Sequence, residues 1–415
     1  MRPLRAIGGA IVAGLLATTL GTAAGPTPGG FTSDDVNYVT YVPFDIGSAT
    51  GMTIRGDFAY VTSWRAVSIY DISDVRDPKL LSTTPFGFRF ENEDVTGNDQ
   101  LLFFSESLPG NTLHIYDIRN PQAPVEIAAV EGAGDHTSQC VLNCEYVYGS
   151  DGSVTWVGQT VDNARNAVLL DMDWTALVNG TRFSNHDAEL IREDLFITTP
   201  ISTDFHLVDV RDPLNPVVLG RGVHPNPSAW LFHSGEWFRG GNDKFLLMQG
   251  EQNFQAQCGE GNGPIVLYEV TNSIFDEFGE RIADLPTENV ERDQEDYDKY
   301  PFTVELKDTY AVANGTYQDG SPAVNGLGCS AHWFESQPDF HDGGMVAVGY
   351  YEHGTRFLEV TNDGQLLEAG WFLPYGGSTS AAYWVDERTV YAVDYARGID
   401  ILKWAGDIPS YAPQG

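Results

Sequence analysis

Apolar and polar residues alternate in short runs along most of the chain. The pattern is clearest in "AVSIYDISDVRDPKLLST" (66–83), "TLHIYDIRNPQAPVEIAA" (112–129) and "DFHLVDVRDPLNPVVLGR" (204–221). In each run an alternating apolar segment ends in Asp, a turn rich in Asp, Asn and Pro follows, and a second apolar segment begins. A period of two residues is typical of β-strands. Proline has no N–H to give to a sheet ladder, so it belongs in the turn.

Four weaker copies bring the number of these units to seven. They are "AVLLDMDW" (167–174), "IVLYEVTN" (265–272), "RFLEVTNDGQLLEAGWF" (356–372) and "GIDILKW" (398–404). A further strand pair precedes the copies, as in "MTIRGDFAYVTS" (52–63), so each unit has four strands. Four strands repeated at intervals of about 40 residues or more form the blade of a β-propeller. The sequence therefore predicts an all-β, seven-bladed propeller of four-stranded antiparallel blades over residues 37–405.

The two ends of the repeat predict how the ring closes. The segment "NYVTYVPF" (37–44) resembles an outer blade strand without the three strands that should precede it. The last unit stops at "ILKW" (401–404), after its third strand. We expect the N-terminal strand to complete the last blade, which leaves no open sheet edge. Residues 25–36 then form a flexible N-terminal segment, and residues 406–415 form a C-terminal tail.

At the "DVRDP" turns and the strand "HLVDV" the sequence resembles the LVIVD-repeat family of β-propellers. The resemblance covers most of residues 37–404. It implies a propeller that is often exported or associated with the cell surface. It implies no single activity.

The first residues indicate export. The basic head "MRPLR" precedes the apolar stretch "AIGGAIVAGLLATTL" and the small residues "GTAAG". This arrangement predicts a signal peptide over residues 1–24, and the apolar part is shorter than the ~20 residues of a membrane span. With 58 acidic and 23 basic residues, the surface repels nucleic acid and anionic lipid. We expect a monomer that is secreted, periplasmic or held at the cell surface, without membrane insertion.

The cysteines and two insertions add local expectations. Four cysteines in an exported chain predict two disulfides: Cys140 and Cys144 would close a local loop, and Cys258 and Cys329 would join distant segments. A cysteine metal site is the alternative. An acidic insertion (273–303) falls between the fifth and sixth units and a second follows it, so residues 273–328 form an insertion-rich region.

Histidines recur at one position of the repeat. Of nine histidines, four fall near the start of the first strand in the third to sixth units, namely His136, His186, His233 and His332. The corresponding position of the second unit carries Glu93 and Asp94. First strands line the central channel of a propeller, so the repeat predicts four imidazoles around the axis. Neutral imidazole is a ligand for Fe, Cu and Zn. The sequence thus predicts a transition-metal site, with Fe or Cu favoured over Zn; a hydrogen-bonded histidine belt around channel water is the alternative.

Loops on the same face supply candidate catalytic residues. Arg65 and Arg397 would bind an anionic group of a small substrate, or else form salt bridges with neighbouring acids. His353 would act as a general acid or base, or as a fifth metal ligand. These residues and the histidines predict a metal-dependent oxidoreductase. The alternatives are a non-catalytic extracellular scaffold, which binds a protein or glycan through its loop face, and a hydrolase that uses carboxylates near Glu93 and Asp94.

Overall fold

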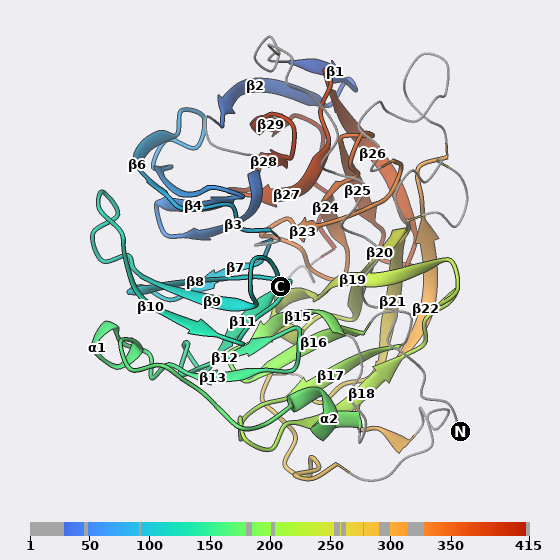
Figure 1. Ribbon diagram of the computed structural model, residues 1–415. Helices are drawn as coiled ribbons and strands as arrows, with labels where there is room; N and C mark the ends of the chain where they lie inside the picture. Colours follow the sequence, from blue (N-terminus) through green and yellow to red (C-terminus); the bar gives the residue numbers. More distant parts are fainter. Residues whose placement is uncertain are drawn as a thin grey trace, which may run out of the picture.

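A computed structural model of the protein describes residues 29–44, 49–90, 93–179, 185–200, 204–252, 258, 263–276, 278–289, 299–313 and 328–411. The expected signal peptide over residues 1–24 lies outside the described residues. Seven antiparallel sheets surround a central axis (Figure 1). Six have four strands, and the sixth blade has an additional fifth strand. The predicted seven-bladed propeller is confirmed.

The first strand of each blade lies nearest the axis (Figure 1). These inner strands are β3 (Ala49–Arg55), β7 (Val95–Gly97), β11 (Ser138–Val141), β15 (Asn185–Arg192), β19 (Trp230–Trp237), β23 (Phe334–Ser336) and β27 (Thr379–Trp384). The second strands are β4 (Phe58–Ser63), β8 (Leu101–Glu106), β12 (Tyr146–Gly149), β16 (Leu195–Pro200), β20 (Phe245–Gln252), β24 (Gly344–Gly349) and β28 (Thr389–Asp394).

The third and outer strands continue each sheet away from the axis. The third strands are β5 (Ala66–Asp71), β9 (Thr112–Asp117), β13 (Val154–Trp156), β17 (Phe205–Asp209), β21 (Ile265–Asn272), β25 (Thr355–Val360) and β29 (Gly398–Trp404). The outer strands are β6 (Lys79–Pro85), β10 (Val125–Glu131), β14 (Val168–Leu169), β18 (Val217–Gly222), β22 (Thr303–Tyr310), β26 (Leu366–Pro374) and β2 (Val36–Pro43). Three short helices complete the described elements: α1 (Val161–Ala164), α2 (Trp174–Asn179) and α3 (Phe238–Gly241).

The hydrophobic core lies between neighbouring blades. One cluster joins Val61 and Tyr70 of the first blade to Tyr391 and Ile401 of the seventh. The inner and middle strands are covered on both faces, which explains why β8 is buried along its whole length. Burial on both faces fixes each sheet against the next and so fixes the positions of the inner strands around the axis.

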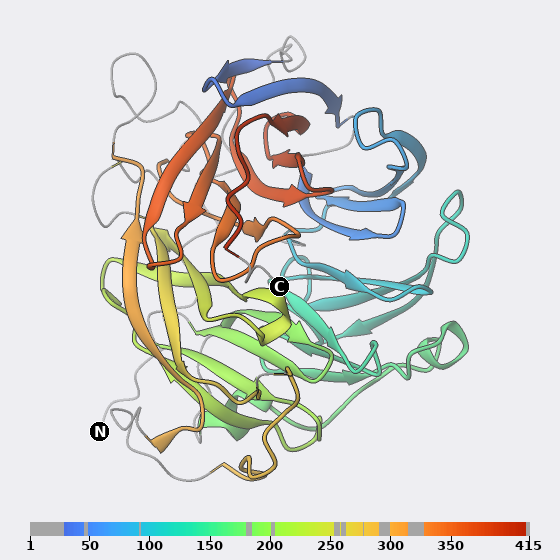
Figure 2. The same cartoon turned by 180° about the vertical axis from the view of Figure 1, so that it is seen from behind.

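The N-terminal strand closes the ring as the sequence predicts. β2 pairs antiparallel with β29, so that the blue N-terminal strand lies beside the red last blade (Figure 2). The register runs from Val36 opposite Trp404 to Pro43 opposite Gly398. A second N-terminal strand, β1 (Gly30–Thr32), pairs with β26 and adds the fifth strand to the sixth blade. Residues 30–32 of the segment expected to be flexible are therefore held by a sheet ladder.

Two placements made from the repeat are wrong. The acidic insertion (273–303) lies within the fifth blade, between β21 and β22, and not between the fifth and sixth blades. The outer strand β22 follows the insertion, and none of its eight side chains is buried, so it lacks the apolar alternation of the repeat. The run "AVLLDMDW" is not a third strand either: it supplies only the short outer strand β14, because α1 separates it from the third strand β13.

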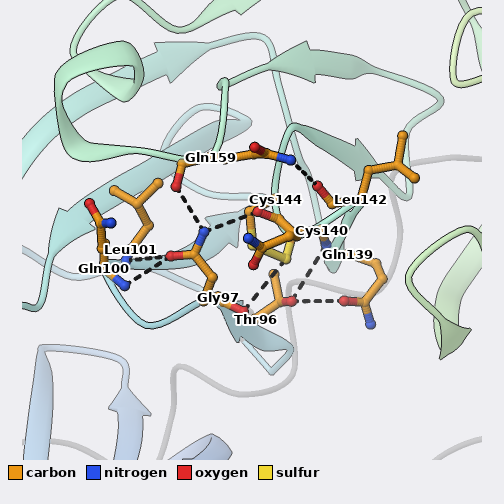
Figure 3. The surroundings of a disulfide bond; sticks show 11 residues. Thr96, Gly97, Gln100, Leu101, Gln139, Cys140, Leu142, Cys144 and Gln159 are labelled. Carbon is orange, nitrogen blue, oxygen red and sulfur yellow. Dashed lines mark hydrogen bonds between the residues drawn. A yellow bond between two sulfur atoms is a disulfide. The ribbon is translucent and has the colours of Figure 1, made fainter.

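The cysteines form the two predicted pairs, Cys140–Cys144 and Cys258–Cys329. The first joins Cys140 of β11 to Cys144 in the turn before β12, beside Thr96 of the preceding blade (Figure 3). The Thr96 hydroxyl donates a hydrogen bond to Oε1 of Gln139 at 2.7 Å. The second pair joins the fifth blade to the sixth. Among the described residues, no helix combines the length and apolar character needed to cross a membrane.

Candidate metal centre

The four histidines meet at one end of the central channel. The imidazole centroids of His136 and His186 are 4.4 Å apart, those of His186 and His233 are 3.8 Å apart, and those of His233 and His332 are 4.1 Å apart. Four successive blades thus contribute side chains at one level of the axis. The structure brings together all four residues that the repeat placed there; metal binding by them stays a prediction.

β-Bulges shape two of the strands that carry these histidines. The ladder between β15 and β16 shifts register between Asn185 and Ala188, and the ladder between β19 and β20 shifts between Phe232 and Ser234. A bulge adds a residue to one strand and re-aims the side chains next to it. His186 and His233 lie at these two irregularities.

Glu93 of the second blade completes the cluster. Its Oε2 atom lies 3.5 Å from Nε2 of His136, 3.7 Å from Nε2 of His233 and 3.3 Å from Nε2 of His332. Glu93, His136, His186 and His233 each offer one ligand atom, and these atoms all lie within 4.8 Å of one another. His233, His332 and Glu251 form a second, overlapping group of the same kind. Four nitrogen donors and one central carboxylate therefore converge.

Hydrogen bonds between blades hold the backbone of the cluster. The Thr137 hydroxyl donates to the carbonyl of His186 at 2.6 Å, and the Thr199 hydroxyl donates to the carbonyl of His233 at 2.9 Å. Nδ1 of His332 lies 2.8 Å from the carbonyl oxygen of Ser380, to which it donates. That bond leaves Nε2 of a neutral His332 as the acceptor atom facing Glu93, which is the arrangement of a metal-binding imidazole.

Two tyrosines border the centre. The Tyr395 hydroxyl donates to Oε1 of Glu93, and the Tyr351 hydroxyl donates to Oε1 of Glu251. The Tyr351 ring lies 4.9 Å from the ring of His332, between centroids. Burial, followed by Glu251, raises the pKa of Tyr351 well above its usual value, so this phenol keeps its proton and acts as a donor.

The charges in the cluster are unevenly shared. Burial lowers the pKa of His233 to about 3, and burial with two neighbouring histidines holds the pKa of His186 well below its usual value. Burial also disfavours the charged forms of Glu93 and His332, but their attraction outweighs it. The pKa of Glu93 lies well below, and that of His332 above, the ordinary value. The centre thus contains mainly neutral imidazoles beside one carboxylate, which suits a cation.

The three residues expected to be catalytic lie outside this cluster. Arg397 is buried and its Nη2 atom lies 2.6 Å from Oδ1 of Asp400. Arg65 is exposed in the turn between β4 and β5. His353 is buried, and one of its ring nitrogens lies within 4.8 Å of the sulfurs of Cys258 and Cys329. Their roles toward a substrate stay predictions.

The central place of Glu93 could be read only in part from the sequence. Its alignment with the histidine positions of the neighbouring units was the available signal. Acids are so frequent in this chain that the signal did not distinguish a ligand from a solubilising side chain. The tyrosines lie in loops between the second and third strands, where the repeat gives no constraint on side-chain direction.

Comparison with known proteins supports the fold. Residues 46–83 match the family described as the LVIVD repeat. The β-propeller domain of Cps50 (Swd1) from Myceliophteria thermophila is 11% identical and superposes with a TM-score of 0.58, covering 90% of this chain and 100% of that domain. U3-55K is 9% identical with a TM-score of 0.54, covering 91% of this chain and 99% of its own.

These likenesses show the architecture alone, since the identities are low. No curated protein matched the chain. The chain is therefore a seven-bladed β-propeller that carries an LVIVD repeat in its first blade.

Proposed function

We propose that the protein binds a transition-metal ion through His136, His186, His233 and His332, and that this centre serves a metal-dependent oxidoreductase. The observation that carries the proposal is the convergence of three imidazole Nε2 atoms on Oε2 of Glu93, at 3.3 to 3.7 Å. Buried imidazoles gathered without a cation repel one another once protonated. An ion removes that cost, because neutral imidazole donates its lone pair.

The donor set favours iron or copper over zinc. Structural zinc sites take four tetrahedral ligands, whereas this cluster offers four imidazoles and a carboxylate. Iron and copper accept imidazole nitrogen and larger ligand numbers. When bound, such a metal supplies electron transfer or oxygen chemistry.

The chain's own residues supply access and orientation. The side chain of His136 is 21% exposed, whereas those of His233 and His332 are 1% and 3% exposed. A small substrate would therefore approach on the side of His136. Tyr395 orients Glu93 through its hydroxyl, and Arg65, Arg397 and His353 remain candidates for substrate contacts.

We also propose that the protein works outside the cytoplasm. The two cysteine pairs support this, because disulfides persist in oxidising compartments. A leader over residues 1–24 would provide the export route.

Elemental analysis of the full chain, produced with export, tests the metal centre. We expect about one Fe or Cu per chain, retained through gel filtration, and its loss in the double variant His186→Gln/His233→Gln. The matched control is His206→Gln/His224→Gln. It changes two buried histidines that lie in and just after the fourth blade, outside the metal centre, and it should keep the metal. Circular dichroism checks that both variants fold.

A metal-free native protein that also fails to take up Fe²⁺ or Cu²⁺ would contradict the proposal. That result would favour a non-catalytic scaffold that binds a protein or glycan through its loop face. Propellers commonly mediate such interactions, and replacement of the four histidines would then leave binding unchanged.

A further inference from the structure

The other half of the central channel forms a cavity of about 460 Å³. Among the described residues, its lining includes four carboxylates, those of Asp94, Glu189, Glu193 and Glu335, one basic side chain, Arg55, and no imidazole. Asp94 directly follows Glu93 in the chain, so this acidic cavity lies next to the histidine cluster along the axis while offering a different set of ligands.

The carboxylates follow the same repeat as the histidines. Three of the inner strands read "HDAE" (186–189), "HSGE" (233–236) and "HWFE" (332–335), with Glu three residues after His each time. In a regular strand, residues three apart face opposite sides. In the fourth blade the bulge beside His186 changes that parity, so that His186 joins the cluster and Glu189 lines the cavity. The propeller therefore presents two levels of ligands on one axis.

Asp94 is the second observation that points to a ligand. It lines the cavity, is 8% exposed, and its buried Oδ2 atom has no hydrogen-bond partner among the described residues. Glu189 also lines the cavity, and its buried carboxyl has no partner there other than the carboxyl of Asp187. A buried carboxylate oxygen without a donor is costly unless a proton or a cation satisfies it. Two such carboxylates, on the second and fourth blades, favour a ligand that is not part of the described chain.

The chemistry of the lining selects the ligand. Oxygen-only donors of negative charge match hard divalent cations, which take carboxylates and keep part of their water shell. The cavity has room for an ion with several waters, since a water molecule occupies about 30 Å³ of liquid. Burial raises the pKa of Glu335 to about 8, and the nearby carboxylate of Glu236 adds to the effect.

We propose that a divalent, oxygen-preferring cation of the Ca²⁺ class occupies this cavity, held directly and through water by Asp94, Glu189 and Glu335 from three different blades. The ion would neutralise the carboxylates beneath the histidine cluster and tie the second, fourth and sixth blades together. This inference does not depend on the transition-metal proposal, because Ca²⁺ has little affinity for imidazole.

Calorimetric titration of the chelator-treated full chain with CaCl₂ tests the inference. We expect one stoichiometric site in the native protein and at least tenfold weaker binding in Glu189→Gln/Glu335→Gln. Gln keeps an oxygen that can accept the bond Glu335 receives from the backbone N–H of Trp384 (3.1 Å). If the double variant does not fold, the same titration of the single variant Asp94→Asn tests the site, and weaker Ca²⁺ binding is expected there too.

Two controls separate this site from others. Glu131→Gln/Glu387→Gln removes two exposed acids and should leave the Ca²⁺ affinity unchanged. His186→Gln/His233→Gln should also keep the site, whatever becomes of the transition metal. The absence of a stoichiometric site, or an equal loss of affinity in the exposed-acid control, would overturn the inference, because the carboxylates would then hold protons only or the binding would be diffuse.

Discussion

The pairing of Glu93 with His332 shows how single residues set the charge of the centre. Glu93 lies 3.3 Å from Nε2 of His332, and the two side chains hold each other's charged form in a buried place. A metal ion would replace the proton of His332 and would keep Glu93 charged. Metal uptake should therefore release a proton.

Glu93→Gln should lower both metal affinity and the pKa of His332. Glu93 is the main group that raises the pKa of His332, and Gln has the same shape without the charge. We expect a loss of at least tenfold in affinity, measured by competition with a chelator, and a lower titration midpoint of His332 in the apo protein by NMR. An unchanged midpoint would show that His332 owes its protonation to other groups.

Glu335 should make the protein less stable as the pH rises. Its pKa is about 8 in the folded chain and about 4.3 in an unfolded one, so between these values the folded state holds more protons and stability falls with rising pH. Glu335→Gln should reduce the difference in the free energy of unfolding between pH 5 and pH 8 by about 1–3 kcal/mol. Urea unfolding in the presence of a chelator measures this free energy at both pH values, with Glu387→Gln as the control. Equal slopes in both variants would contradict this expectation.

At the scale of elements, inner strands approach one another closely enough to exclude side chains. A Cβ atom on Gly51 of β3 would lie 1.6 Å from the carbonyl oxygen of Glu93 in the next blade. The glycine thus allows the segment that carries Glu93 to reach its place near the axis. Its role is positioning, since the three atoms nearest to an added Cβ all belong to the backbone of Glu93.

Gly51→Ala should displace Glu93 and weaken metal binding without changing a ligand. Overpacking of this kind costs about 1–3 kcal/mol of stability. The matched control is Gly87→Ala, where a Cβ would meet nothing within 4 Å. Metal content and thermal unfolding report the two effects. If Gly51→Ala binds metal as the native protein does, the close approach has no part in placing Glu93.

The individual strands also differ in how well the sequence predicts them. The units at 66–83, 112–129 and 204–221 are readable because short strands of mostly apolar residues end in Asp at a Pro-containing turn, and the structure confirms strands on both sides of these turns. β14 has only two residues, and β22 follows a long insertion, so neither carries a readable period. Counting residues from the start of each strand predicts where the histidines lie along the axis. It does not predict the distances between them, their convergence on Glu93 or the burial of the carboxylates in the acidic cavity. These features depend on contacts between blades that are far apart in the sequence.

At the scale of the whole molecule, the ring is held by a ladder and a covalent link. β2 and β29 join the two ends of the chain, and Cys258–Cys329 joins the fifth and sixth blades across a sequence separation of 71. Cys140–Cys144 spans a separation of only 4 within the third blade. A disulfide that closes a longer loop removes more entropy from the unfolded chain, so the two disulfides should contribute differently to the free energy of unfolding.

Cys258→Ser/Cys329→Ser should therefore destabilise the protein more than Cys140→Ser/Cys144→Ser. The chain-entropy relation gives about 4 kcal/mol for the first pair and about 2 kcal/mol for the second. Urea midpoints of the two variants and of the native protein provide the comparison. A larger loss from the short loop would mean that local packing around Thr96 and Gln139 outweighs chain entropy.

The ladder between β2 and β29 makes β2 a separable part of the last blade. Its eight residues, "VNYVTYVP", bind mainly through one edge of the last sheet. A chain shortened to begin after residue 44 would present that edge as a vacant slot, and a synthetic peptide of this sequence should enter it and restore cooperative unfolding. The ring would then behave as a receptor for its own missing segment.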